Sequence, residues 1–517
     1  MESISTFLSW RNVAVAAVVY LASLSYYRLY LHPLARFPGP KIAALTRWYE
    51  AYYDVVQNGQ YISRVEEMHK KYGPIIRISP YELHVHDPAF FEQLYRQDGR
   101  WDKYAWAYDA FAGPGATVFT AEHDLHKARR QPLNSYFAKA KVAKRQDLIK
   151  RNVIKLCGRL SEFATAAASD KTTKTVNLGA ATSAFARDTA SEFIVGKNYN
   201  NLDEDDFNAR ITVVFQGSGQ LWRITKHVRW FSPTLMAIPK DWVIKTANKA
   251  TSNLFRFLQR SEQDVKEIMA SASSSIAKDS GPELPRSIVH DILDSGLPPA
   301  EKTFYRVSTE VETIMFAGYE TTASVLRLVF FHVFSDGEIL ARLRAELAAA
   351  SIPSEPGAVE ASALEKLPYL TSVIMEGLRL SPGIAARMQR IAPDRDLFYD
   401  RWRIPAGTPV GMTSVLLHTD ESLYPEPRRF NPDRWVDGGS QRNISKSYAP
   451  FSRGTRVCLG MHFAWAEMYL ALSALVQQFD FGFEGATAED FHWASDQFVI
   501  GTRAHGALHA RVSHRRS

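Results

Sequence analysis

The sequence of 517 residues contains only two cysteines, Cys157 and Cys458. Two thiols exclude a disulfide framework and a cysteine-rich zinc site, although one disulfide bond between them stays open. Cys157 lies in an apolar helical pattern, and we interpret it as a buried core thiol. This scarcity favours a reducing cytosolic environment. It also leaves Cys458 as the cysteine whose surroundings need an explanation.

The sequence also lacks a strong charge of either sign. Lys plus Arg number 62 and Asp plus Glu number 55, which gives a net charge of +7 with neutral histidines. No run of five basic residues occurs, whereas nucleic-acid binding proteins usually concentrate their basic residues in blocks. We therefore expect no nucleic-acid partner. The mild excess suits an anionic membrane surface or an acidic protein partner, and equally an ordinary solvated surface.

Long apolar runs are rare, and only one approaches the length of a membrane span. It covers Asn12–Tyr27 and reaches about 20 residues if Arg11 and Arg28 extend their side chains to the membrane interface. The first ten residues carry no Lys or Arg, unlike a cleaved signal peptide. Basic residues follow the run, which places the bulk of the chain in the cytosol. We expect residues 1–31 to form a single-pass anchor and the proline-rich residues 32–41 to form a hinge.

Helical periodicity dominates the remaining sequence, and strand-like runs are few and short. The pattern predicts one large, mainly α domain with a minor β-sheet, which covers residues 42–517. The strand-like runs are PIIRISP, ELHVHD, FYDRWRIPAG and HGALHARV. The predicted long helices cover residues 63–72, 145–167, 178–195, 235–269, 299–334, 338–350, 364–380 and 462–479.

Cys458 lies in the segment PFSRGTRVCLGMHFAWAE. A nucleophilic cysteine stays open at this point, because His462 follows four residues later as a candidate base. Glycines at 454 and 460 favour another use, since they let a flat, bulky group approach the backbone. The strong helical pattern after Gly460 places the sulfur near a helix N-terminus, which stabilises a thiolate. Such a thiolate can ligate haem iron, where it pushes electron density toward the metal and favours O–O cleavage.

The spacing Phe451-x-x-Gly454-x-Arg456-x-Cys458-x-Gly460 resembles the haem-binding signature of the cytochrome P450 superfamily. The resemblance implies that haem b is the cofactor and that Cys458 is its metal ligand. It further implies that Phe451, Arg456 and Gly460 contact the haem, and that the domain has the cytochrome P450 fold.

The segment Ala317-Gly318-x-Glu320-Thr321-Thr322 lies in the longest predicted helix and is similar to the oxygen-activation motif of this family. Glycine followed by two threonines weakens a helix. A threonine hydroxyl beside a carboxylate can relay protons. The resemblance implies that Glu320 and Thr321 are catalytic and that Ala317 lies against the cofactor. Alone, the motif favours a helix distortion beside a solvated glutamate.

Glu376 and Arg379 stand three residues apart on a predicted helix and are therefore neighbours on its surface. The resemblance implies that they bind Arg434 in the segment PRRFNPDRW and support the haem loop.

The propionates of a haem need cations or hydrogen-bond donors. By resemblance these are Arg456, Arg390 and Arg130. Family members usually carry tryptophan four residues before the last of these arginines, and this sequence has His126 there. We expect His126 to donate to a propionate, more strongly if it is protonated.

Segments at residues 101–119, 221–239, 316–321, 383–388 and 497–500 match the access and pocket segments of the family. They are rich in aromatic and aliphatic residues, which suits an apolar small-molecule substrate. The run QGSG does not complete a dinucleotide-binding loop, because the third glycine is lacking. We therefore expect electrons to come from NADPH-cytochrome P450 reductase, with cytochrome b5 as a second candidate donor.

The resemblance extends from Phe37 to the C-terminus, and the entry segment is similar to fungal microsomal members such as trichodiene-oxygenase-like enzymes. It implies an endoplasmic-reticulum monooxygenase with a cytosolic catalytic domain. The expected reaction inserts one oxygen atom of O2 into a terpenoid or polyketide intermediate of secondary metabolism. Two alternatives stay open: a haem-thiolate isomerase or dehydratase that does not use O2, and a non-enzymatic haem-binding membrane protein.

Overall fold

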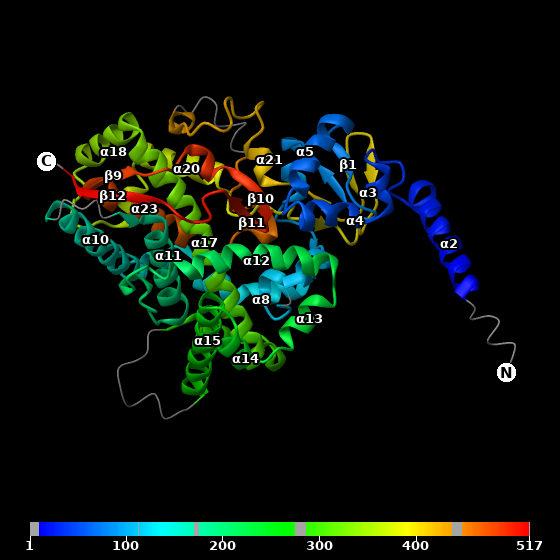
Figure 1. Ribbon diagram of the computed structural model, residues 1–517, viewed down its shortest axis with the longest axis horizontal. Helices are drawn as coiled ribbons and strands as arrows, with labels where there is room; N and C mark the ends of the chain where they lie inside the picture. Colours follow the sequence, from blue (N-terminus) through cyan, green and yellow to red (C-terminus); the bar gives the residue numbers. More distant parts are fainter. Residues whose placement is uncertain (1–9, 112, 170–174, 274–285, 437–446, 516–517) are drawn as a thin grey trace.

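Long helices make up most of the chain in the computed structural model, as the sequence predicts (Figure 1). The structure describes residues 10–111, 113–169, 175–273, 286–436 and 447–515. The helices of ten or more residues in the domain are α5 (Tyr61–Tyr72), α8 (His123–Tyr136), α10 (Gln146–Ser169), α11 (Leu178–Val195), α12 (Ala209–His227), α15 (Lys249–Ser273), α17 (Phe304–Ser335), α18 (Gly337–Ala349), α20 (Pro368–Leu380) and α23 (Met461–Gln478).

Helix α17 forms the centre of the molecule and packs against α11, α15, α20 and α23 (Figure 1). It is apolar over most of its surface, which is typical of a helix surrounded by other helices. Gly377 of α20 permits the closest approach, because a Cβ there would lie 2.3 Å from Cγ2 of Val329. The position of α17 is therefore fixed from several sides.

The largest sheet has five strands in the order β1-β2-β8-β5-β3. Strand β2 pairs antiparallel with β1 and parallel with β8, and β5 pairs antiparallel with both β8 and β3. The strands are β1 (Ile75–Arg77), β2 (Leu83–Val85), β3 (Asp102–Lys103), β5 (Arg390–Ile391) and β8 (Val410–Gly411). The β3–β5 register places Lys103 opposite Arg390.

Three smaller sheets complete the strands. In the first, β9 (Phe479–Phe483) and β4 (Val176–Asn177) flank β12 (His509–His514). In the second, β6 (Leu397–Tyr399) pairs with β7 (Trp402–Ile404). In the third, β10 (Trp493–Gln497) pairs with β11 (Val499–Thr502). All four strand-like runs of the sequence are confirmed as β1, β2, the β6–β7 hairpin and β12.

The helix predictions differ from the structure in three places. The helix expected over residues 235–269 is divided, with breaks on both sides of α14 (Lys240–Thr246), which begins directly after Pro239. Short α13 (Phe231–Met236) precedes it and α15 follows it. Helices α8 and α12 were missed. Pro132 lies inside α8, and two glycines lower the helix propensity of α12.

The N-terminal segment projects from the rest of the molecule as helix α2 (Trp10–Tyr26), continued by a π-helical turn at Tyr27–Leu31 (Figure 1). Residues 10–31 are long and apolar enough to cross a membrane, and none of their side chains is buried. Helix α17 meets the same criteria of length and composition, but it is largely buried in the core. Residues 1–9 of the expected anchor lie outside the described residues.

The segment after the anchor packs onto the domain. Arg28, which we expected to reach toward the membrane interface, instead donates hydrogen bonds to the Leu45 carbonyl and the Tyr81 hydroxyl. Phe37 is buried and stacks on Trp402 with ring centroids 4.9 Å apart. The hinge role of residues 32–41 stays a prediction, since these contacts hold the segment against the domain in this conformation.

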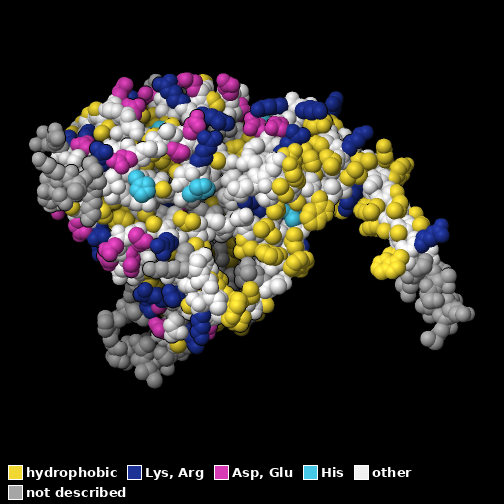
Figure 2. Space-filling model, in the orientation of Figure 1, with side chains coloured by type: hydrophobic (Ala, Val, Ile, Leu, Met, Phe, Trp, Pro, Cys, Tyr) yellow, Lys and Arg dark blue, Asp and Glu magenta, His cyan; other side chains and the backbone are white. Residues whose placement is uncertain are grey.

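Exposed apolar side chains gather on the face next to α2 (Figure 2). Ile42 of α3 (Lys41–Leu45), Trp48 of α4 (Trp48–Ala51) and Val56 are all more than half exposed. Contiguous exposed apolar side chains often mark an interaction surface.

Candidate active site

The loop that carries Cys458 is fixed by its own backbone and by the segment beneath it. The Cys458 N–H donates to the Phe451 carbonyl at 2.9 Å and closes the loop. Gly454 has a φ of +73°, and a Cβ there would lie 2.5 Å from the Arg96 carbonyl oxygen. Packing within the protein therefore requires Gly454, whereas the sequence suggested the approach of a ligand. At Gly460 a Cβ would meet no atom within 4 Å.

The Cys458 side chain is accessible although protein surrounds it. Its surface is exposed, and yet burial raises the pKa of its thiol, an effect that the Gly460 N–H and the Arg130 charge oppose. A thiol that is exposed and yet has its pKa raised by burial must face open space deep inside the protein. Ala317, in the middle of α17, is likewise exposed, although Met315 and Tyr319 on the same helix are fully buried.

Arg456 binds the backbone at the start of α8 and has one free donor. Its guanidinium donates to the carbonyls of Thr120 at 2.7 Å and Ala121 at 2.8 Å. Its buried Nε has no hydrogen-bond partner among the described residues. Burial and the nearby charge of Arg390 lower the pKa of Arg456 to about 9. An anionic group beside Arg456 would relieve both costs.

The β3–β5 register brings Lys103 beside Arg390. Burial lowers the pKa of Lys103 well below its usual range, and the charges of Arg456, Arg390 and Arg130 lower it further. The Lys103 ammonium donates to the Val118 carbonyl and lies 4.1 Å from the ring centre of Tyr108. Lys103 was not among the site residues expected from the sequence.

Arg130 and His126 of α8 complete this cluster of cations. Burial lowers the pKa of Arg130, and the charge of Cys458 acts in the opposite direction. Burial lowers the pKa of His126 to about 2, and the charges of Arg456 and Lys103 contribute. With so low a pKa the ring is neutral, and a neutral ring can still donate one hydrogen bond. The expected donation from His126 to a propionate stays a prediction.

Lys103, Arg130, Arg390 and Arg456 form no ion pair with any described carboxylate. Burying several cations without anions is costly, so the arrangement fits an anionic ligand. A haem would meet these requirements, since it carries two propionates and an iron that a thiolate can ligate.

Helix α17 presents the expected oxygen-activation motif to this interior. The Thr321 hydroxyl donates to the Ala317 carbonyl at 2.7 Å. Gly383 lies against Thr321, since a Cβ at Gly383 would be 3.7 Å from the Thr321 Cβ. The structure thus brings together α17 and the segment at residues 383–388, two of the expected pocket segments.

Glu320 is directed toward α11 and away from Thr321. Its carboxylate pairs with Arg327 at 3.1 Å and lies 3.9 Å from the guanidinium of Arg187. The second carboxylate oxygen has no hydrogen-bond partner among the described residues. Glu320 and Thr321 are neighbours in the sequence. Among the described residues, no hydrogen bond joins their side chains.

Three of the expected pocket segments meet in an aromatic cluster. Phe111 stacks on Phe119 at 4.6 Å and on Trp222 at 5.7 Å between ring centroids. Phe498, at the tip of the β10–β11 hairpin, meets Phe111 edge-on at 4.6 Å and Trp222 at 5.4 Å. We call Phe111, Phe119, Trp222 and Phe498 the aromatic wall.

The predicted Glu376–Arg379–Arg434 network is present and fully buried at its centre. Glu376 accepts hydrogen bonds from Arg379 at 2.7 Å, from Arg434 at 3.1 Å and from the Trp435 indole at 3.0 Å. Arg379 in turn donates to the His418 carbonyl at 2.7 Å.

His418 extends this network to the haem loop and was missed in the sequence. Its Nε2 accepts from the Ala449 N–H at 3.1 Å, and its ring is fully buried. Burial lowers the pKa of His418 to about 3, so the ring is neutral and can accept. Sequence spacing gave no signal for it, because its partners come from distant segments.

Comparisons with known proteins agree with this site. Residues 47–504 match the cytochrome P450 family. The chain is 34% identical to the N-acetyltryptophan 6-hydroxylase of Emericella nidulans, with 96% of each chain covered. It is 34% identical to the cytochrome P450 monooxygenase TRI4 of Fusarium sporotrichioides, with 95% of this chain and 92% of that one covered.

The fold has a counterpart among solved structures. A cyanobacterial cytochrome P450 with retinoic acid bound superimposes with a TM-score of 0.67 at 19% identity, over 90% of this chain and 96% of that one. The chain therefore belongs to the cytochrome P450 family, and it is a monooxygenase with a haem-thiolate cofactor. Relatives named as hydroxylases and monooxygenases do not favour an isomerase, a dehydratase or a non-enzymatic protein.

Removing the charge of Glu376 should destabilise the protein and its haem loop. Glu376→Gln leaves Arg379 buried without its carboxylate, so we expect the free energy of unfolding to fall by about 3–5 kcal/mol. Urea denaturation of the holoprotein measures this change. The control is Glu426→Gln, which removes an exposed ion pair with Arg429 and should change stability by less than about 1 kcal/mol. Equal losses in both variants would contradict the structural role of the network.

Proposed function

We propose that Cys458 is the axial ligand of the haem iron and that Arg130, Arg390 and Arg456 hold the propionates, with His126 as a neutral donor. The observation that carries the proposal is the cluster of buried cations without carboxylates beside an exposed, deeply placed thiol. Thiolate-ligated haem supplies the activation of molecular oxygen. Phe451, packed against the core, and Gly460, which faces open space, border the sulfur.

The residues of α17 hold and move protons in this proposal. Ala317 carries only a methyl group where α17 is exposed to the cavity, which leaves room for a small molecule. The Thr321 hydroxyl keeps an acceptor lone pair while it donates to the Ala317 carbonyl. Glu320 carries protons to Thr321 once its carboxylate leaves Arg327, so the observed ion pair is the resting arrangement.

The aromatic wall favours a substrate with a flat aromatic ring. Stacked and edge-on arrangements of such rings stabilise a complex beyond simple burial. The relatives include a tryptophan 6-hydroxylase of Fusarium equiseti and an N-acetyltryptophan 6-hydroxylase, whose names specify indole substrates. We infer an aromatic intermediate of secondary metabolism as the substrate. A terpenoid or polyketide is the second candidate, supported by the likeness to TRI4.

Electrons come from NADPH-cytochrome P450 reductase in this proposal, with cytochrome b5 as a second donor. Helix α9 (Lys139–Lys144) contacts both α8 and the helix α23 that follows the Cys458 loop. Helices α8 and α9 carry Lys127, Lys139 and Lys144 at their exposed positions. This basic surface suits an acidic partner.

We further propose that α2 anchors the protein in the endoplasmic-reticulum membrane, with the domain in the cytosol. The unburied apolar helix supports this proposal, and so does the exposed apolar face beside it (Figure 2). Arg28 and the segment after it then hold that face toward the bilayer.

The haem site is tested by the absorption spectrum of the reduced, CO-bound protein. We expect a strongly red-shifted Soret band in the wild type and its loss in Cys458→Ala, because only a thiolate ligand produces that shift. A band that the substitution leaves unchanged would contradict the assignment of Cys458.

The same spectrum, normalised to folded protein, tests the propionate cations. Arg130→Gln should lower the haem content, whereas Arg129→Gln, which removes a pair with Glu301, should lower stability but leave the haem content per folded chain unchanged. Equal haem loss in the two variants would rule out a specific role for Arg130.

The substrate class is tested by titrating the oxidised protein with indole and with a sesquiterpene hydrocarbon. We expect indole to shift the Soret band and Phe498→Ala to weaken its binding about tenfold, because one edge-on ring contact is lost. NADPH-dependent product should form only when the reductase is added. A shift with the terpene alone would favour the second candidate.

The anchor is tested by deleting residues 1–26, which removes α2 and retains the contacts of Arg28. We expect the full chain to stay in the membrane pellet after alkaline carbonate extraction, and the deletion variant to be released. Retention of the deletion variant would assign membrane binding to the exposed apolar face alone.

A further inference from the structure

A second cluster of charged side chains lies next to Trp222 of the aromatic wall. Its carboxylates are Glu50 of α4, Asp54 of the π-helical turn at Tyr52–Val56, and Glu82 before β2. Its cations are Lys226 of α12 and Arg387, which follows α20. These five side chains are at most 3% exposed.

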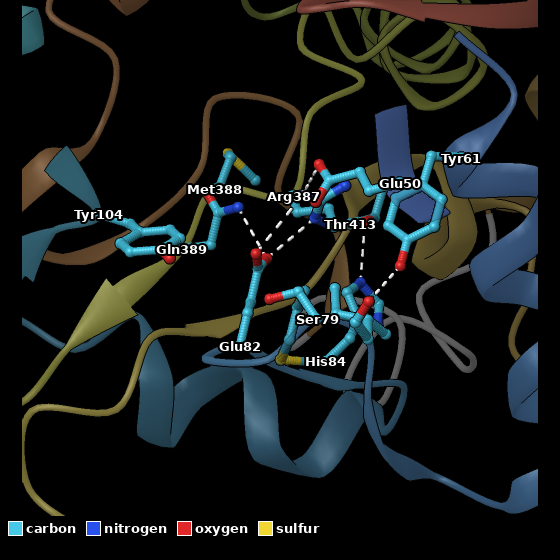
Figure 3. Close-up of polar contacts among 12 residues, drawn as sticks. Glu50, Tyr61, Ser79, Glu82, His84, Tyr104, Arg387, Met388, Gln389 and Thr413 are labelled. Carbon is cyan, nitrogen blue, oxygen red and sulfur yellow. Dashed lines mark hydrogen bonds and ion pairs between the residues drawn. The ribbon is translucent and has the colours of Figure 1, made fainter. Parts of the chain in front are cut away.

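Glu50 is the residue that the two cations share. One of its oxygens, Oε1, lies 2.8 Å from the Lys226 ammonium and 2.7 Å from the Arg387 guanidinium. Lys226 also pairs with Asp54, and Arg387 pairs with Glu82 at 2.9 Å. Figure 3 shows Glu82 bound by Arg387 and Gln389, with Glu50 beyond Arg387. The chain of contacts therefore runs from α12 through α4 to the segment at residues 387–389.

Opposite charges determine the ionisation of the cluster. Burial lowers the pKa of Lys226, but Asp54 and Glu50 more than reverse this effect and raise it. The pKa of Arg387 is raised in the same way by Glu50 and Glu82 against burial. Each cation is thus held charged between two carboxylates.

Glu50, Asp54 and His227 together have the donor atoms of a metal site. However, the Lys226 ammonium already donates hydrogen bonds to both carboxylates. A divalent ion would have to displace a buried cation, so the cluster is a protein-only ion-pair network.

The network is joined to the aromatic wall by the residues next to its members. The Lys226 ammonium lies 4.6 Å from the ring centre of Trp222, one turn earlier on α12. Between them, Arg223 donates to the Asp496 carbonyl at 2.7 Å, and Phe498 follows two residues after Asp496. Gly219 lets α12 approach the hairpin, because a Cβ there would lie 2.3 Å from the Gln497 carbonyl oxygen.

We propose that Lys226 is a positioning residue for the substrate pocket: its ion pairs with Glu50 and Asp54 hold α12, and with it Trp222, against Phe111 and Phe498. The inference rests on the proposed substrate site and goes beyond it. Breaking a buried pair leaves an uncompensated charge, which drives the carrying elements apart or admits water. Loss of Lys226 therefore loosens the wall without touching the haem cations or Cys458.

The test compares two azole probes that bind the iron of the full-length holoprotein, imidazole and 4-phenylimidazole. Imidazole reaches the iron without needing the wall, whereas the phenyl ring contacts it. In Lys226→Met we expect the imidazole dissociation constant to stay within about twofold, while the 4-phenylimidazole constant rises about tenfold. Lys226→Arg should retain most of the wild-type ratio, because it keeps the charge.

Glu50→Gln provides a milder variant if Lys226→Met does not fold. Lys226 then keeps Asp54 and Arg387 keeps Glu82, so we expect a folded protein and about a threefold rise in the ratio. The control is Lys240→Met, which breaks a partly exposed ion pair between Lys240 of α14 and Glu262 of α15. It should leave both constants unchanged.

A wild-type ratio in Glu50→Gln, and in any folded Lys226→Met protein, would overturn the proposal and leave the network a purely structural role. Equal weakening of both probes would overturn it as well, because the effect would then lie at the haem. Binding of imidazole to the wild type reports on the proposed haem site, and only the ratio reports on Lys226.

Discussion

The uncompensated positive charge beside Cys458 is the constraint on which the rest of the site depends. Lys103, Arg130, Arg390 and Arg456 come from four separate segments and converge without an ion pair to any carboxylate of the described residues. Folding alone does not explain why the protein buries unpaired cations, which is unfavourable without a ligand of opposite charge. Three features fit a flat ligand with negative charges at one edge and a metal at its centre. They are the cations, the internal position of the thiol and the open space at Gly460.

The network around Lys226 shows the opposite pattern, and the contrast separates a ligand site from a structural one. There each buried cation lies between two carboxylates, and opposite charges keep the groups ionised. Beside Cys458 burial lowers the pKa of His126 to about 2, and the like charges of Arg456 and Lys103 act in the same direction. The balance of charge thus distinguishes the two clusters.

Local spacing explains what the sequence predicts well. The loop around Cys458, the motif at Glu320–Thr321 and the pair Glu376–Arg379 each involve residues close in sequence. Each pattern can therefore be recognised in a single short segment. The order of the long helices follows from periodicity in the same way. Lys103 could not be found like this, because a strand register far along the chain brings it to Arg390. The reason for Gly454 was misread, since the carbonyls that require it belong to residues 95–96.

Helix α12 illustrates how tertiary contacts override local preference. Its glycines lower its helix propensity, yet Gly219 is needed where the β10–β11 hairpin meets the helix surface. The cost in helix propensity is offset by the close approach that brings Phe498 to Trp222. The aromatic wall therefore depends on long-range packing, whereas the loop around Cys458 is contained in residues 451–460.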